Sequence, residues 1–201
     1  EIHERLVGSE MCIRDSCNGK PVHLHTKKVI YAYNKPIGQV CTSKDTDPDS
    51  IFRYVEFPER VNYVGRLDKD STGLLLLTND GDLANEIQRS RNNHEKEYHV
   101  RVNTDITEDF IKKMSEGVEI LDTVTKPCKV KKTGTRNFSI ILTQGLNRQI
   151  RRMCDALHVR VVHLKRVRIM NIRLGSLRPG EFRTLTRGEE QELRRLVQKR
   201  S

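Results

Sequence analysis

The sequence predicts an α+β protein with a mixed, mostly antiparallel sheet flanked by helices. Three observations favour this class. Strand-like and helix-like segments alternate irregularly along the 201 residues, neighbouring strand segments are joined by short turns, and hydrophobic residues make up 35% of the chain, enough for a globular core. No internal repeat or low-complexity linker divides the sequence, so we expect one compact unit.

Each element is predicted by its residue pattern. Strands are indicated by β-branched and aromatic residues or by alternation, and helices by apolar spacing between capping residues. The expected strands are two within 29–43, turning at Pro36 and Gly38, and one each at 61–65, 74–80, 96–102, 125–134, 137–145, 159–175 and 181–186. The expected helices are a short one within 45–55, then 82–90, 106–117, 147–158 and 189–200, the third of them capped by Thr107 and closed by Gly117.

The two ends of the chain are interpreted differently from its middle. Residues 1–16 begin without Met, show no periodicity and resemble a translated sequencing-adapter fragment, so we exclude them as a non-native segment. Residues 189–201 read as a basic C-terminal helix and tail. The segment 28–188 between these ends is expected to form the functional domain.

The charge of the chain points to a polyanionic partner. Lys and Arg number 37 against 27 Asp and Glu, and the formal charge is +10. The five cysteines form no C-x-x-C pair, which disfavours a zinc knuckle or a disulfide framework, and we expect neither a metal nor a cofactor. No apolar stretch reaches the roughly 18 residues that cross a bilayer, so we expect a soluble, cytoplasmic protein without a membrane partner.

Asp68 lies between an arginine and a long apolar run in "VGRLDKDSTGLLLLTND". It follows a strand, at a loop position where catalytic side chains are often presented, but a turn or helix-cap aspartate has the same pattern. A carboxylate beside an apolar wall needs a cationic partner to stay ionised. Helical spacing places Arg151 at the edge of an apolar face and turns Arg148 and Arg152 to the far side, although all three could form a solvated basic face.

Tyr98 and a basic stripe complete the candidate site. In a strand, Tyr98 shares a face with Lys96 and Val100, and an aromatic ring beside basic side chains suits base stacking, although a core tyrosine is the commoner case. The segment 159–175 carries Lys165, Arg166 and Arg168, among other basic residues, with apolar residues between them, which fits a strand that is electropositive on one side.

Five motifs occur together in order: "GRLDKDSTGLLLLTNDGDL", "KEYHV", "GLNRQIRRMCDAL", "LKRVRIMNIRLG" and "PGEFRTL". With them the chain resembles the RsuA/RluB/RluE/RluF family of ribosomal RNA pseudouridine synthases, and "NNHEKEYHV" and "ILDTVTKPCKVKK" resemble its RluF branch. The resemblance implies a two-part catalytic domain with an active-site cleft between its halves. It also implies isomerisation of a uridine in large-subunit (23S) ribosomal RNA without a cofactor.

The resemblance also implies roles for individual residues. Asp68 would be the catalytic nucleophile or base, Tyr98 the ring that stacks on the flipped base, and Arg151 the partner of Asp68. Arg66 would take the place of the flipped nucleotide, and Leu164 and Arg166 would line the pocket floor. Lys96, Arg148, Arg152, Lys165 and Arg168 are expected to bind RNA.

The resemblance leaves some questions open. Family members carry an N-terminal S4 RNA-binding domain, of which residues 17–27 would be a remnant. A non-catalytic RNA-binding module that kept the basic groove is the alternative, and a base deaminase is disfavoured because the sequence lacks its Cys/His zinc set. We expect a monomer, and the sequence leaves open whether a transfer RNA is a second substrate.

Overall fold

A computed structural model describes residues 16–17, 20–21, 27–44, 46–89 and 94–198 of the chain. The expectations for the segment before residue 27 therefore lie almost wholly outside the described residues. The strands are β1 (Ser16–Cys17), β2 (Lys20–Pro21), β3 (Ile30–Lys35), β4 (Asn62–Val64), β5 (Thr72–Thr78), β6 (Lys96–Val102), β7 (Glu119–Ile120), β8 (Thr123–Val124), β9 (Lys129–Gly134), β10 (Asn137–Leu142), β11 (Val161–Ile169), β12 (Ile172–Arg173) and β13 (Phe182–Thr184). The helices are α1 (Ile51–Tyr54), α2 (Gly81–Gln88), α3 (Glu108–Glu116), α4 (Gln149–Ala156) and α5 (Arg187–Gln198).

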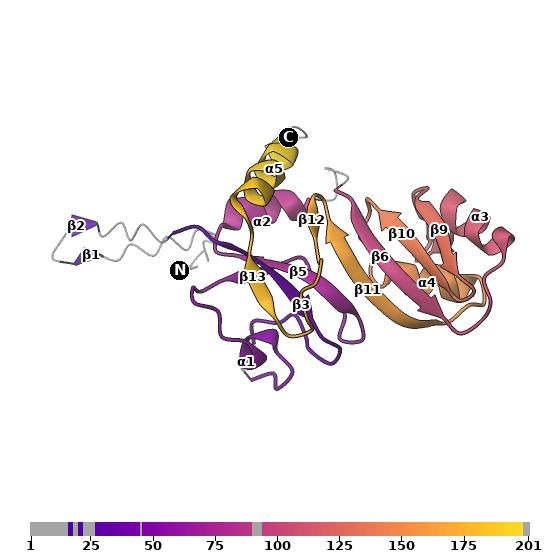
Figure 1. Ribbon diagram of the computed structural model, residues 1–201, viewed down its shortest axis with the longest axis horizontal. Helices are drawn as coiled ribbons and strands as arrows, with labels where there is room; N and C mark the ends of the chain where they lie inside the picture. The colour runs from indigo at the N-terminus through magenta and orange to yellow at the C-terminus, as the bar shows by residue number, and fades with distance from the viewer. Residues whose placement is uncertain (1–15, 18–19, 22–26, 45, 90–93, 199–201) are drawn as a thin grey trace, which may run out of the picture.

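One nine-stranded sheet runs through the molecule, and its main path is β13-β3-β5-β11-β6-β10-β9 (Figure 1). β4 pairs with β5, and β12 pairs with β11. Within this sheet the described strands pair antiparallel, except for β5 and β11, which pair in parallel at the centre. The predicted α+β class with a mixed, mostly antiparallel sheet is therefore confirmed.

Both faces of the β13-β3-β5 half are covered. On one face, Leu74 and Leu76 of β5 pack with Leu83 of α2 and Leu193 of α5. On the other face, apolar and aromatic side chains of β3, β5 and the α1 segment form a second core, centred on the fully buried Tyr33. This burial on both sides explains why the "LLLL" run shows no alternation of apolar and polar residues.

The β11-β6-β10-β9 half is covered on one face. Val100 and Phe138 of the sheet pack with Phe110 of α3 and Met153 of α4 in a single core. Alternate residues of the same strands, such as His99 and Arg101, are exposed on the other face. This half is therefore an antiparallel sheet with one covered and one open face.

The structure differs from the expected elements at several places, among them the unpredicted short hairpin β7–β8. Residues 39–43 form no second strand, and Val40 makes only an isolated bridge to Ser50. The expected long strand at 159–175 is the hairpin β11–β12, which turns at Met170 with a φ of 51°. The expected boundary after residue 188 falls inside α5, whose Leu193 and Val197 are buried in the core. None of the helices in the described part of the chain is long and apolar enough to span a bilayer.

Candidate active site

A short loop between β4 and β5 carries Asp68 and is held from several directions. The Ser71 amide donates to the Asp68 carbonyl at 3.0 Å, and the Gly38 amide donates to the Lys69 carbonyl at 2.8 Å. Beneath the loop, the fully buried Lys35 donates its Nζ to the Ser71 carbonyl at 2.8 Å. Asp68 therefore sits in a fixed turn before a strand, which rules out the helix-cap interpretation, and its side chain is 36% exposed.

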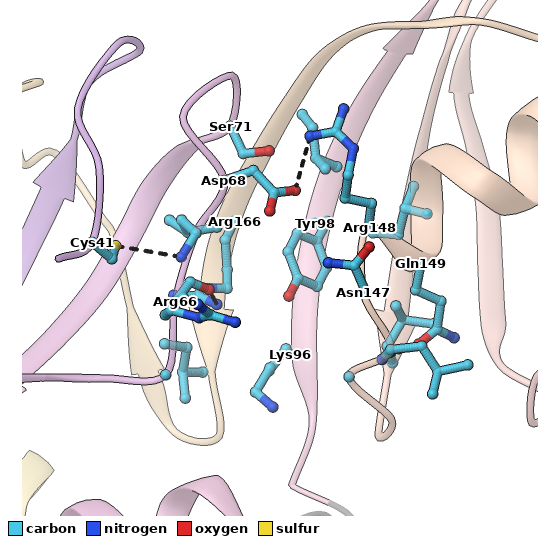
Figure 2. A pocket seen from close by; sticks show the side chains of 18 of the residues that line it. Cys41, Arg66, Asp68, Ser71, Lys96, Tyr98, Asn147, Arg148, Gln149 and Arg166 are labelled. Atoms are coloured by element: carbon cyan, nitrogen blue, oxygen red, sulfur yellow. Dashed lines mark hydrogen bonds and ion pairs between the residues drawn. The ribbon is translucent and has the colours of Figure 1, made fainter. Parts of the chain in front are cut away.

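Arg148 is the cation that faces Asp68. Its Nη1 lies 3.6 Å from Asp68 Oδ2 (Figure 2), and its guanidinium also forms a two-pronged pair with Asp70, at 3.1 and 2.9 Å. The hydrogen bonds from Arg148 hold the pKa of Asp70 below its ordinary value, and burial opposes this effect. Asp70 therefore stays ionised and fixes the guanidinium beside the carboxylate of Asp68.

The prediction that Arg151 pairs with Asp68 is wrong. Arg151 does lie at the edge of the apolar face of α4, 11% exposed, but its Nη2 donates to the Asp70 carbonyl at 2.9 Å and lies 3.3 Å from Asp70 Oδ2. The side-chain directions expected from helical spacing are wrong for Arg148 because it is not a helical residue. It is the N-cap of α4, with a left-handed φ of 49°, so its side chain leaves the direction that helical spacing assigns to it.

Tyr98 and Lys96 project into the same pocket from β6. Figure 2 shows the Tyr98 ring between the Asp68 side of the pocket and Asn147. Burial and the positive charge of Arg166 lower the pKa of Lys96, and no carboxylate among the described residues pairs with its amine. The pocket therefore offers an aromatic face next to a cation that is not neutralised.

Arg166 and Gly73 join β11 to β5 at the pocket floor. Arg166 is 3% exposed and donates its Nε to the Leu74 carbonyl at 2.7 Å and its Nη1 to the Arg66 carbonyl at 3.4 Å. Its Nη2 is buried without a hydrogen-bond partner among the described residues. Gly73 permits this close approach, because a Cβ there would lie 2.2 Å from the Arg166 carbonyl oxygen.

The pocket encloses about 540 Å³, within the roughly 300–1,000 Å³ of small-molecule sites. It lies where β5, β11 and β6 adjoin, between the two halves of the sheet. Of the residues named from the sequence, those that line it are Arg66, Asp68, Lys96, Tyr98, Arg148, Leu164 and Arg166. The exposed Arg66 lies at its rim, and its side chain has no ion pair within the described residues.

Three expected RNA-binding residues do not line this pocket. Arg152 is exposed and donates to the Asn147 carbonyl. Lys165 stands opposite His99 on the neighbouring strand, and both side chains lie on the face of the sheet away from the pocket. Arg168 lies on that face as well, because the register of β11 shifts between Arg166 and Arg168, and it is bound to Glu95 and Glu97. The ion pairs of Arg168 join it to the segment of Glu95 and Glu97, and its role in RNA binding stays a prediction.

The sequence analysis missed two residues that position the site. Asp70 is the second acid of "DKD", and Lys35 precedes Pro36 at the end of β3. Burial lowers the pKa of Lys35, and the nearby carboxylates of Asp68 and Asp70 oppose that shift. The sequence could have pointed to Asp70, because it is an acid two residues after Asp68. Nothing in the local pattern indicates that Lys35 is buried beneath the Asp68 loop.

The fold and the pocket define a protein built around a carboxylate, a cation and an aromatic ring at the seam of a mixed sheet. Residues 29–156 match the family described as RNA pseudouridylate synthase. A solved structure described as "Crystal structure of pseudouridylate synthase" is 32% identical, with a TM-score of 0.77, and the alignment covers 85% of this chain and 74% of that one. The chain belongs to the RNA pseudouridylate synthase family.

Curated relatives agree with this assignment. The chain is 53% identical over 173 residues to "Dual-specificity RNA pseudouridine synthase RluF" of Escherichia coli K12, an alignment that covers 86% of this chain and 60% of the relative. It is 30% identical over 205 residues to "Ribosomal large subunit pseudouridine synthase B" of Bacillus subtilis, covering 98% of this chain and 82% of the relative. The chain thus spans about 60% of the length of the RluF relatives that it matches.

Proposed function

We propose that this chain isomerises a uridine to pseudouridine in large-subunit (23S) ribosomal RNA. The observation that carries the proposal is the half-buried Asp68, faced by Arg148 and placed beside Tyr98 in a basic pocket on the fold of this family. The relative named as a ribosomal large subunit pseudouridine synthase supports the choice of RNA.

The target uridine must leave its helix or loop before its C1′ and C5 atoms can be reached. Extrusion costs a few kcal/mol, and stacking on an aromatic ring offsets part of that cost. Tyr98 supplies the ring inside the pocket, and Arg66 at the rim is placed to fill the space that the base leaves in the RNA. Lys96 lines the same pocket from the same face of β6, so its amine is placed to meet a carbonyl oxygen of the stacked uracil.

Asp68 acts on the extruded nucleotide as a nucleophile or as a base toward the ribose. The bond between C1′ and N1 breaks, the uracil turns within the pocket, and a new bond forms between C1′ and C5. N1 gains a proton, and C5 loses the one it carried, so the reaction is an isomerisation. An ionised Asp68 is needed in either role, and the Arg148 guanidinium lies 3.6 Å from its carboxylate.

Asp70 and Arg151 position these groups without touching the substrate. Asp70 orients the Arg148 guanidinium, and Arg151 ties the backbone of residue 70 to α4. We therefore assign to Arg148 the role of Asp68 partner that the resemblance implied for Arg151. The role of Arg151 becomes the positioning of the loop.

The scope of the activity is also part of the proposal. The relatives named as dual-specificity RNA pseudouridine synthases favour a second RNA substrate, and a transfer RNA is the one to test. We propose that the chain acts in the cytoplasm as a monomer.

The test is to incubate the protein with 23S ribosomal RNA and transfer RNA transcripts and to map pseudouridine by carbodiimide treatment and reverse transcription. We expect a new stop at one position or a few neighbouring positions of the ribosomal transcript. If folded protein in excess binds the transcript but produces no stop, the non-catalytic RNA-binding module that keeps the same groove becomes the better account.

A further inference from the structure

The open face of the β11-β6-β10-β9 half carries a second concentration of positive charge. Besides the ion-paired Arg168, strand register places six basic side chains on it: Lys129, Lys131, His99, Arg101, His163 and Lys165. We call this set the open basic face. It lies on the side of the sheet opposite to Lys96 and Tyr98, so a base bound in the pocket does not contact it.

The six residues form cross-strand rows. Lys131, Ser139, His99 and Lys165 stand opposite one another on four neighbouring strands, and Arg101 stands opposite His163 in the adjacent row. With strands about 4.8 Å apart, the first row is about 14 Å long. Lys129 and Lys131 lie about 7 Å apart along β9, and Arg101 and Lys165 are diagonal neighbours about 8 Å apart on β6 and β11. The two charges of each pair therefore lie within about one Debye length at physiological salt, and their potentials add.

Few acids neutralise this face. Lys129, Lys131, Arg101 and Lys165 have no ion pair among the described residues. Two carboxylates beside this face, Glu95 and Glu97, are already bound by Arg168. The pKa of His163 is lowered by burial first and then by the positive charges of Lys165, Arg151 and Arg101, so the local potential is positive.

The covering of the sheet leaves this face accessible. α3 and α4 both pack on the other side, and Figure 1 shows β11, β6, β10 and β9 with none of the described helices in front of them. An ordinary solvated sheet face carries charges of both signs, since like charges placed opposite one another destabilise a strand pair. An excess of one sign is relieved when a polyanion binds.

We propose that the open basic face is a second RNA-binding surface, which holds the phosphate backbone of a segment distant from the modified uridine. The inference rests on the proposed function, because that function supplies the RNA. It predicts that a large folded RNA contacts both sides of the sheet, whereas a short hairpin that fills the pocket contacts one. Replacing these residues should therefore weaken the binding of a long RNA more than the binding of a short hairpin.

The test compares the double variant Arg101→Gln/Lys131→Gln with the control Lys112→Gln/Arg178→Gln, which removes one exposed lysine and one exposed arginine elsewhere. Binding is measured by filter retention against salt for a 23S ribosomal RNA transcript and for a short hairpin cut from it. For the transcript, the double variant should bind several-fold more weakly, with a salt slope flatter by about two, since each phosphate contact contributes about one. Hairpin binding should be unchanged, and melting curves check folding.

Two results would overturn the proposal. The double variant could match its control on the transcript, or it could lose the same affinity for hairpin and transcript. Loss of binding to phosphatidylserine vesicles without any change for RNA would assign the face to a membrane surface instead. Binding is scored without turnover, so failure here is distinguishable from failure of the proposed isomerisation, which the mapping experiment reports.

Discussion

Arg148 gains its contact with Asp68 from a single backbone conformation. Its φ of 49° places it before the first turn of α4, and Asp70 then fixes its guanidinium through two hydrogen bonds. A left-handed conformation costs a non-glycine residue on the order of 1 kcal/mol, so the surrounding contacts must hold it. This position separates Arg148 from Arg152, which points away and contacts Asn147.

Arg148→Ala should slow the chemical step at least about tenfold, the effect of losing about 1.4 kcal/mol of electrostatic support. Arg152→Ala is the matched control, and it should weaken RNA binding while leaving the saturated single-turnover rate unchanged. Arg148→Lys should restore part of the rate, because it keeps the charge but not the two-pronged geometry. Equal single-turnover rates for the two alanine variants would remove Arg148 from its assigned role.

Replacements of Tyr98 separate its ring from its hydroxyl. Tyr98→Phe should retain most of the affinity for the extruded base, whereas Tyr98→Ala should lose about 1–3 kcal/mol of stacking. Fluorescence of RNA carrying 2-aminopurine next to the target uridine reports extrusion. If both variants lose extrusion equally, the hydroxyl and not the ring is responsible.

At the level of single residues, local sequence patterns predicted part of the site. Alternation placed Tyr98 and Lys96 on one face, and the turn before the apolar strand marked Asp68. The partner of Asp68 could not be predicted, because helical spacing applies only within the helix and Arg148 caps it. The face on which Arg168 lies could not be predicted for a similar reason, since the register shift in β11 reverses the alternation that a sequence pattern assumes.

At the level of elements, the pairing of β5 with β11 depends on Gly73. Its φ of 102° and the absence of a side chain let the two backbones meet at Arg166. Gly73→Ala should destabilise the fold by about 3 kcal/mol or more, because backbone atoms must move and the alanine conformation is strained. Gly81→Ala, at an open position where α2 begins, should change stability by less than about 1 kcal/mol. Urea unfolding of both variants checks the contrast, and equal midpoints would contradict it.

The start of α5 gives a pH-dependent test. Glu189 accepts from the amide and hydroxyl of Thr186 and pairs with Arg183. The hydrogen bond from Arg183, more than any other contact, lowers the pKa of Glu189 from 4.5 to about 2. Because the folded-state pKa is depressed, this stabilisation is present above pH 4.5 and is lost as the pH falls towards 2.

Glu189→Gln should therefore lower the free energy of unfolding at pH 7 by about 1 kcal/mol, after allowing for partial exposure of the pair. The difference from the wild type should narrow below pH 4.5. Glu192→Gln is the control on the same helix, since its pair with Arg195 is more exposed. A difference that stays constant from pH 7 to pH 3 would show that the pair contributes through packing and not through its charge.

At the scale of the whole molecule, the site depends on contacts between segments far apart in the sequence. The alternation of strand and helix patterns was enough to predict the α+β class, and short connections predicted antiparallel pairing. The central parallel pair, β5 with β11, joins residues about a hundred positions apart, and no local pattern specifies it. The pocket forms at that seam, so its complete lining could be seen only in the folded chain.

The central claim is that Asp68 in this pocket exchanges the C1′–N1 bond of a uridine for a C1′–C5 bond. Because C5 must lose its hydrogen, 23S ribosomal RNA labelled with tritium at C5 of uridine should release tritium in single-turnover reactions with the wild type. Asp105→Asn, at an exposed carboxylate paired with Arg136, should release it at the same rate. Asp68→Asn should bind the RNA but release tritium more than about a thousandfold slower. Release by Asp68→Asn at a rate close to that of the wild type would contradict the account.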